Sequence, residues 1–251
     1  METEMMSASG GALPQWEAML LSRQEDVLRL LEQLLERVRR AEEVLAGVPK
    51  DDEPVARVKQ AARALPIPSA AFRRVPSTYY EWPLTRRRRC LGAPSVHQVS
   101  ITTLLLCKTI MLENTHCTRT GCSDPRNSRY YAVIIQYTTR LQSQKVFKFV
   151  RKLNPEISKK HFKFRLAPEE ISDQLTGFGK GAVCPVGMNT PIPVILSDRL
   201  TRLSPQFMWL GGGHIDVKLG CNVTEFITAT KCYVADIVYD EASEAANELD
   251  D

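Results

Sequence analysis

Residues 176–188 read Thr176-Gly-Phe-Gly-Lys-Gly-Ala-Val-Cys-Pro-Val-Gly-Met188 and hold four of the chain's 13 glycines. Glycine has no Cβ, so backbone N–H groups in such a run can approach a ligand closely. The stretch is neither a dinucleotide fingerprint nor a Walker loop, because no G-x-G-x-x-G opens a helix and Lys180 precedes Gly181. Two interpretations stay open: a backbone cradle for a carbonyl or an ester, closed at Pro185, and a glycine-rich turn between two strands.

On both sides of this stretch, short apolar runs with strand character alternate with short helical patterns. The runs that predict strands are residues 99–110, 130–137, 162–166, 191–197, 207–210, 215–219 and 233–238. The patterns that predict helices are residues 141–153, 168–175 and 223–229. Strands of these lengths joined by short helices predict an α+β domain over residues 77–239.

One lysine interrupts an apolar strand pattern upstream of the glycine stretch. Lys108 stands inside the run of residues 99–110. An unpaired ammonium is costly to bury, so this side chain either extends to water or serves a site.

The N-terminal region and the C-terminal tail differ in composition from the predicted domain. Residues 1–12 and the acidic tail, residues 240–251, are expected to be disordered. Residues 13–46 carry a heptad seam at Leu20, Val27, Leu31, Leu34, Val38, Ala41 and Leu45. The seam predicts a coiled-coil helix that dimerises or docks on a larger assembly, and the alternative is a helix folded back on the domain. Residues 47–76 are expected to be a linker with a short helix at 55–65.

Two basic stretches suggest contact with RNA. Arg86 and Arg87 lie beside the aromatic residues of Tyr79-Tyr-Glu-Trp-Pro83, and phosphate pairing combined with base stacking is typical of RNA recognition. Residues 140–165 are also strongly basic, and their candidates for phosphate contact are Lys145, Lys148, Arg151 and Lys152. The alternatives are an aromatic anchor in the core and solvated charged faces.

Composition narrows the function classes. The 251 residues have a net charge of +4, and seven cysteines show no regular framework. His116, Cys117 and Cys122 supply at most three ligands, so no metal site and no cofactor are expected. The acidic N-terminus does not read as a signal peptide, and no apolar run is long enough for a membrane span. We therefore expect a cytoplasmic protein with reduced thiols.

Three segments together resemble the YbaK/prolyl-tRNA synthetase-associated editing-domain family: residues 107–110, 175–187 and 211–219. The family's loop pattern T-G-x-x-x-G-x-x-x-P appears here as Thr176, Gly177, Gly181 and Pro185. The resemblance implies a mixed, partly barrel-like sheet with flanking helices. It also implies hydrolysis of the ester of a mischarged aminoacyl-tRNA, and it assigns the family's lysine to Lys108.

A catalytic site follows from this resemblance. Successive N–H groups of Gly181, Ala182, Val183 and Cys184, in the loop closed at Pro185, would polarise the ester carbonyl, and Lys108 would hold the ester or the terminal nucleoside. Cys184 occupies a position where the family often has serine or threonine. The residues expected to contact substrate are Thr176, Gly177, Asp198, Gly212 and His214.

The sequence thus supports two functions of different classes. The first is a trans-acting deacylase for mischarged tRNA. The alternative is a non-catalytic module that binds aminoacyl-tRNA and is recruited through its N-terminal helix to a synthetase or multi-synthetase assembly. A homodimer through residues 20–45 is compatible with either function.

Overall fold

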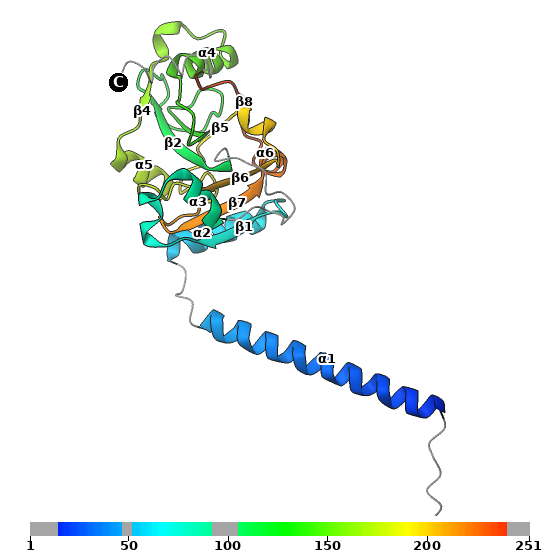
Figure 1. The fold of residues 1–251 in the computed structure, drawn as a ribbon. Helices are drawn as coiled ribbons and strands as arrows, with labels where there is room; N and C mark the ends of the chain where they lie inside the picture. The colour runs from blue at the N-terminus through cyan, green and yellow to red at the C-terminus, as the bar shows by residue number, and fades with distance from the viewer. Residues whose placement is uncertain (1–14, 47–51, 92–104, 240–251) are drawn as a thin grey trace, which may run out of the picture. The chain divides into compact units, whose positions relative to one another are not determined.

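The computed structural model describes residues 15–46, 52–91 and 105–239 (Figure 1). The segments expected to be disordered, residues 1–12 and 240–251, lie outside the described residues. The chain divides into two compact units, residues 1–50 and residues 51–251, and each is described by itself.

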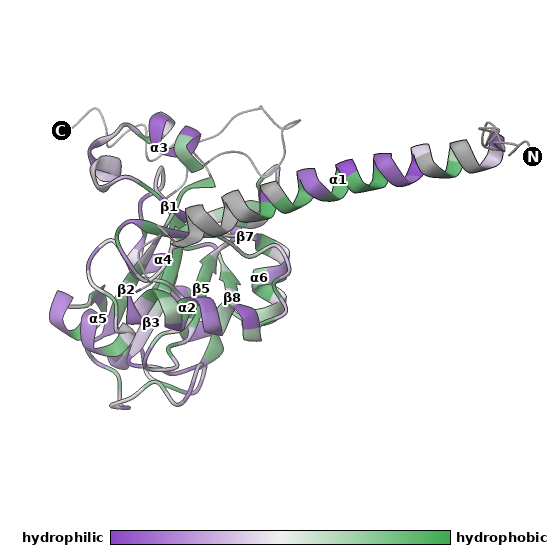
Figure 2. Ribbon diagram, turned by 90° about the horizontal axis from the view of Figure 1, so that it is seen from below, coloured by the Kyte–Doolittle hydropathy of each residue, from purple (hydrophilic) through white to green (hydrophobic). Residues whose placement is uncertain are grey.

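The first unit contains one long helix, α1 (Gln15–Ala46). Its 32 residues make a helix of about 48 Å. Apolar and polar residues alternate along it turn by turn (Figure 2). The described apolar side chains that are exposed are Trp16, Met19, Leu20, Val27, Leu28, Leu30, Leu31, Leu34, Leu35 and Val38. The helix is confirmed, and its pairing with another helix stays a prediction.

The second unit is built on a five-stranded mixed sheet with the order β4-β2-β3-β5-β8. Its strands are β2 (Cys107–Asn114), β3 (Tyr130–Gln136), β4 (Phe164–Leu166), β5 (Val194–Ser197) and β8 (Tyr233–Ala235). β2 runs antiparallel to β3 and β4, whereas β3, β5 and β8 run parallel.

A second sheet has three antiparallel strands in the order β1-β7-β6. They are β1 (Ala71–Arg74), β6 (Phe207–Gly211) and β7 (Val217–Asn222). One isolated bridge, Leu106 to Trp209, joins the two sheets. The predicted α+β class is therefore confirmed, but the partly barrel-like single sheet is wrong. The contact is a single pair at the residue before β2, so the two sheets do not close into a barrel.

Helices cover both sheets (Figure 1). They are α2 (Glu53–Ala64), α3 (Leu84–Leu91), α4 (Ser143–Leu153), α5 (Glu169–Thr176) and α6 (Val223–Thr230), with short 3₁₀ helices η1 (Ser77–Glu81), η3 (Lys159–His161) and η4 (Asp198–Arg202). The sequence patterns located α2, α4, α5 and α6 within about two residues, whereas no helix was predicted at α3, whose arginines were singled out as RNA contacts.

The five-stranded sheet is buried on both faces. Successive residues of a strand point to opposite faces. On β3, Ile134 belongs to a core cluster shared with β6 and β7, whereas Ile135 belongs to a second cluster that includes Val146 and Val150 of α4. The pocket described below lies on the first of these faces.

Residues 53–76, which were predicted to belong to a linker, form a helix and a strand of the second unit. Val55 and Val58 of α2 are fully buried, and the next strand, β1, pairs with β7. The side chain of Arg57 donates a hydrogen bond from Nε to the carbonyl oxygen of Gly187 at 2.8 Å. Because Val55, Val58 and Ala62 repeat at helical spacing, α2 presents a narrow apolar stripe that packs into the core. The segment is part of the domain.

Candidate active site

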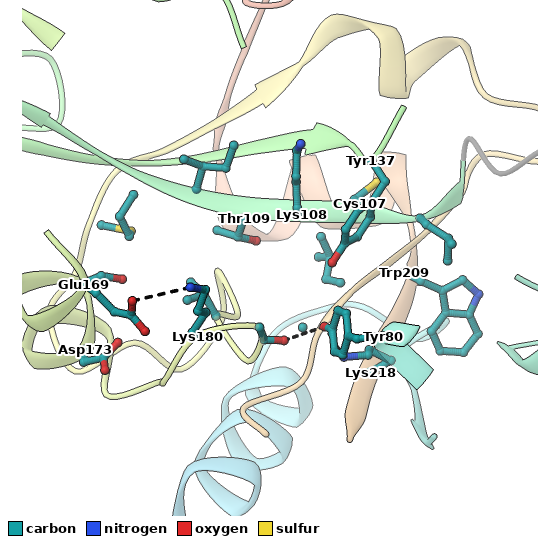
Figure 3. Close-up of a pocket in the computed structure, with 18 of the residues that line it drawn as sticks. Tyr80, Cys107, Lys108, Thr109, Tyr137, Glu169, Asp173, Lys180, Trp209 and Lys218 are labelled. Atoms are coloured by element: carbon teal, nitrogen blue, oxygen red, sulfur yellow. Dashed lines mark hydrogen bonds and ion pairs between the residues drawn. The ribbon is translucent and has the colours of Figure 1, made fainter. Parts of the chain in front are cut away.

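A cavity of about 540 Å³ lies between the two sheets. Its wall is formed by the first residues of β2, by η1, by α5, by the loop after α5, and by β6 and β7 (Figure 3). Apolar side chains make up much of the wall, and a few polar groups converge on it, as is typical of small-molecule sites. This cavity is the candidate active site.

The glycine stretch supplies one side of the cavity as a tight turn. The N–H of Ala182 donates to the carbonyl oxygen of Gly179 at 3.0 Å, and Gly181 has a φ of +78°. A positive φ at the third position of a β-turn is the geometry of type II, which favours glycine. The stretch therefore forms a turn, but it joins α5 to β5 rather than two strands, and its use as a backbone cradle stays a prediction.

Two backbone donors of this turn are unused. Gly181 and Val183 both line the cavity. Within the described part of the chain, neither of their N–H groups donates a hydrogen bond. A pair of unused amides beside a cavity can receive an oxygen that carries developing negative charge.

The Gly211-Gly-Gly213 run explains why the turn can lie against β6. A Cβ on Gly211 would lie 2.4 Å from the carbonyl oxygen of Val183, so no side chain fits there. The N–H of Gly213 donates to the carbonyl oxygen of Ala182 at 3.1 Å. These contacts fix the turn on the end of β6.

A buried lysine of β7 faces this turn. Lys218 is 4% exposed, and its Nζ donates to the hydroxyl of Tyr80 and to the carbonyl oxygen of Ile215, both at 2.7 Å. The Tyr80 hydroxyl donates in turn to the carbonyl oxygen of Gly181 at 2.8 Å. Figure 3 shows these groups on one side of the cavity. An amine, a phenol and the glycine turn are therefore connected directly.

Burial sets the electrostatics of this lysine. Loss of hydration lowers the pKa of the Lys218 ammonium to about 8, Asp216 opposes the shift and Arg87 reinforces it. Burial also raises the pKa of Tyr80, so its hydroxyl stays protonated. Arg87 is held by the carbonyl oxygens of Tyr80 and Trp82. At neutral to mildly alkaline pH, Lys218 can change its protonation state.

Sequence reasoning missed Lys218 and Tyr80. In the sequence, Lys218 alternates with apolar residues, which predicts a strand with one solvated face. In the structure, that face is covered by η1 and the glycine turn. The sequence feature that could have indicated Lys218 is its position within seven residues of the Gly211-Gly-Gly213 run.

Lys108 is one of the residues that line the cavity, but its side chain is directed differently from the predicted one. It pairs with Ile135 across the ladder, and Ile135 belongs to the cluster on the α4 face of the sheet. Its side chain points away from Lys180 and Lys218 (Figure 3). Its Nζ lies 5.9 Å from the ring centre of Tyr137, and burial lowers its pKa, with a smaller effect of Arg140. Strand alternation therefore separates this amine from the glycine turn.

The rest of the predicted catalytic loop is structural. Cys184 and Pro185 are buried, and burial raises the pKa of the Cys184 thiol to about 12. A thiol with so high a pKa is not a nucleophile at neutral pH. Ala182 is also buried, and its N–H and carbonyl are engaged in the contacts described above. Gly181 and Val183 are the loop residues that reach the cavity.

The predicted substrate contacts lie outside the cavity lining. Thr176 caps the end of α5 through Ser172, and Gly177 ends the helix with a φ of +73°. Gly212 closes the β6–β7 turn by donating to Val217. The two remaining residues make local contacts as well. Asp198 accepts from Arg202 at 2.6 Å, and His214 accepts the N–H of Asp216 at 3.1 Å.

The two predicted RNA-binding stretches lie in different places. Arg86 and Arg87 belong to α3, which adjoins the cavity through Leu91. Lys145, Lys148, Arg151 and Lys152 belong to α4, which packs on the opposite face of the five-stranded sheet. Lys145 is paired with Asp236 at 3.0 Å, whereas Lys148 and Lys152 are exposed.

The described residues carry neither a cluster of metal ligands nor a helix able to span a membrane. Among them, no group of three or more histidine, cysteine or acidic side chains is arranged to hold a metal ion. None of the described helices combines the length and the apolar character that crossing a membrane requires.

Comparison with known proteins gives the class of this chain. Residues 97–228 match the family model of the aminoacyl-tRNA editing domain, and the chain belongs to that family. The resemblance seen in the sequence is thereby confirmed. A comparison with curated proteins finds no match.

Solved structures share the fold. A candidate trans-editing enzyme for prolyl tRNA synthetase is 20% identical, with a TM-score of 0.57 over 76% of this chain and 100% of that one. A hypothetical protein is 21% identical, with a TM-score of 0.53 over 73% of this chain and 99% of that one.

Proposed function

We propose that this chain is a trans-acting deacylase that hydrolyses the ester of mischarged aminoacyl-tRNA. The observation that carries the proposal is the connection of Lys218 through Tyr80 to Gly181, because it places an ionisable amine beside the unused amides of the turn. Membership of the editing-domain family supports the substrate class.

The amides supply stabilisation of the transition state. Water attacks the ester carbonyl carbon, and negative charge develops on the carbonyl oxygen. The free N–H groups of Gly181 and Val183 are the donors available to that oxygen. One such donor contributes about 3 kcal/mol in acyl-transfer enzymes.

Lys218 supplies the base. In the neutral amine, two N–H bonds donate to Tyr80 and Ile215, which leaves the nitrogen lone pair to accept a proton from the attacking water. The bond between the carbonyl carbon and the ribose oxygen then breaks, and the ribose oxygen takes the proton from the ammonium. The products are a free amino acid and an uncharged tRNA.

Purified protein incubated with tRNAs charged with proline, alanine, cysteine and serine tests the activity. We expect faster release of at least one amino acid than occurs spontaneously, and loss of that acceleration in Lys218→Met. Spontaneous rates throughout the panel would favour the non-catalytic alternative, provided that the protein still binds the charged tRNAs.

The exposed apolar face of α1 supports a second proposal, that this helix joins the chain to an assembly in the cytoplasm. Ten large apolar side chains on one helix need a partner surface. The proposed partner is α1 of a second copy, and the alternative is a synthetase or multi-synthetase assembly. Light scattering of the full chain and of a chain lacking residues 13–46 distinguishes the two partners. A full chain that is a dimer and a shortened chain that is a monomer would support self-association. Monomers in both cases would point to another partner.

A further inference from the structure

Four arginines from two neighbouring elements form a basic surface beside the cavity. This arginine surface consists of Arg73 of β1 and Arg86, Arg88 and Arg89 of α3. Arg73 donates from Nη1 to the carbonyl oxygen of Cys90 at 3.3 Å, which holds β1 against the end of α3. None of the four forms an ion pair with a described carboxylate.

The arginine surface is continuous with the cavity wall. Arg87 of the same helix binds the carbonyl oxygen of Tyr80, and Leu91 lines the cavity. The Arg73 guanidinium lies 5.9 Å from the ring centre of Trp209, another lining residue. A chain whose end enters the cavity on the side of Leu91 and Trp209 passes next to these arginines.

The surface also offers a planar stack. The Arg86 guanidinium lies over the indole ring of Trp82 at 4.0 Å from its centre. Arginine planes and aromatic rings are the groups on which unpaired bases stack, and guanidinium groups pair with phosphates. Trp82 is half-buried, so the stack is anchored while Arg86 is exposed. This combination fits single-stranded RNA better than it fits an acidic peptide.

The other basic region is poorly placed for the same role. Its exposed members, Lys148 and Lys152, lie on α4, and α4 covers the face of the five-stranded sheet opposite to the cavity. An acceptor end that follows α4 would have to cross the sheet to reach Lys218.

We infer that the arginine surface binds the single-stranded 3′ end of the tRNA and guides it into the cavity, and that α4 does not. The inference rests on the proposed function, because it names the RNA path to that site. It predicts salt-dependent binding, since each phosphate contact releases counterions.

A binding experiment with an RNA hairpin that carries no amino acid tests this inference without any ester chemistry. The hairpin has a single-stranded CCA end, and its binding is followed by fluorescence anisotropy between 50 and 200 mM NaCl. Two charge-reversal pairs are compared: Arg86→Glu with Arg89→Glu, and Lys148→Glu with Lys152→Glu. We expect the first pair to raise the Kd roughly tenfold. We also expect it to reduce the dependence of log Kd on log salt concentration by the equivalent of about two phosphate contacts. We expect the second pair to stay within about twofold of the unmodified protein.

The inference is overturned if the α4 pair loses as much affinity for the hairpin as the α3 pair, or more. It is also overturned if the unmodified protein does not bind the hairpin. Thermal melting of both variants checks the fold, and Arg86→Gln with Arg89→Gln gives a milder form of the same test. Deacylation is measured separately. Normal hairpin binding without ester hydrolysis would contradict the proposed activity and leave the RNA path intact.

Discussion

The ammonium nitrogen of Lys218 lies 2.7 Å from the hydroxyl oxygen of Tyr80, which itself donates to the carbonyl of Gly181. These residues come from β7, η1 and the turn after α5. The two hydrogen bonds join residues separated by 138 and 101 positions. The site therefore exists only in the folded chain, and the hydroxyl connects its amine to the glycine turn.

Removing that hydroxyl should uncouple the two parts of the site. Tyr80→Phe keeps the ring and deletes both hydrogen bonds of the hydroxyl oxygen. We expect deacylation to slow by roughly 10- to 100-fold, because the turn and the amine are no longer held together. Single-turnover release of the amino acid measures this. Tyr79→Phe, which loses no hydrogen bond among the described residues, is the comparison, and equal losses in the two variants would refute the role of Tyr80.

The reaction should depend on pH through Lys218. Its pKa is about 8, and the neutral amine is the base, so the rate corrected for spontaneous hydrolysis should rise up to about pH 8 and level off above it. A rate–pH profile from pH 6 to 9 tests this, with Lys218→Met as the control that lacks the inflection. A flat or falling profile would be incompatible with a lysine base.

The free energy of unfolding should also depend on pH through Lys218. The ordinary lysine pKa is 10.5 and that of Lys218 is about 8, so between these values the unfolded chain binds more protons than the folded chain. The free energy of unfolding should therefore rise with pH, by roughly 1 kcal/mol per pH unit relative to Lys218→Met. Urea denaturation at pH 8.0 and 9.5 measures the difference. Parallel behaviour of the two proteins would show that Lys218 is not buried as described.

The packing of the turn on β6 gives a further prediction. Gly211→Ala places a Cβ 2.4 Å from the carbonyl oxygen of Val183, so the turn must shift. We expect destabilisation of about 1–3 kcal/mol together with slower deacylation. Gly179→Ala is the matched control, because nothing lies within 4 Å of its added Cβ. Thermal melting and single-turnover rates of the two variants should differ clearly, and similar values would argue against this close approach.

Periodicity predicted most of the elements, because strand and helix patterns depend on neighbouring residues. The strand at Tyr130 and the helix before the glycine turn are examples. The site depended on long-range contacts that no local pattern reveals. Lys108 lies on a predicted strand, yet its face was set by the pairing with Ile135. The alternation around Lys218 is typical of a solvated face, but η1 covers that face, and α2 lies in a predicted linker, yet its valines are buried in the core.

The choice between two lysines tests the account most directly. Deacylation of the preferred mischarged tRNA is measured under single-turnover conditions for Lys218→Met and Lys108→Met, with thermal melting of both variants as the check on folding. The geometry predicts a rate loss of at least about 100-fold in Lys218→Met and a much smaller loss in Lys108→Met, since the Lys108 side chain points away from Lys218. An equal or greater loss in Lys108→Met would contradict the assignment of the base to Lys218.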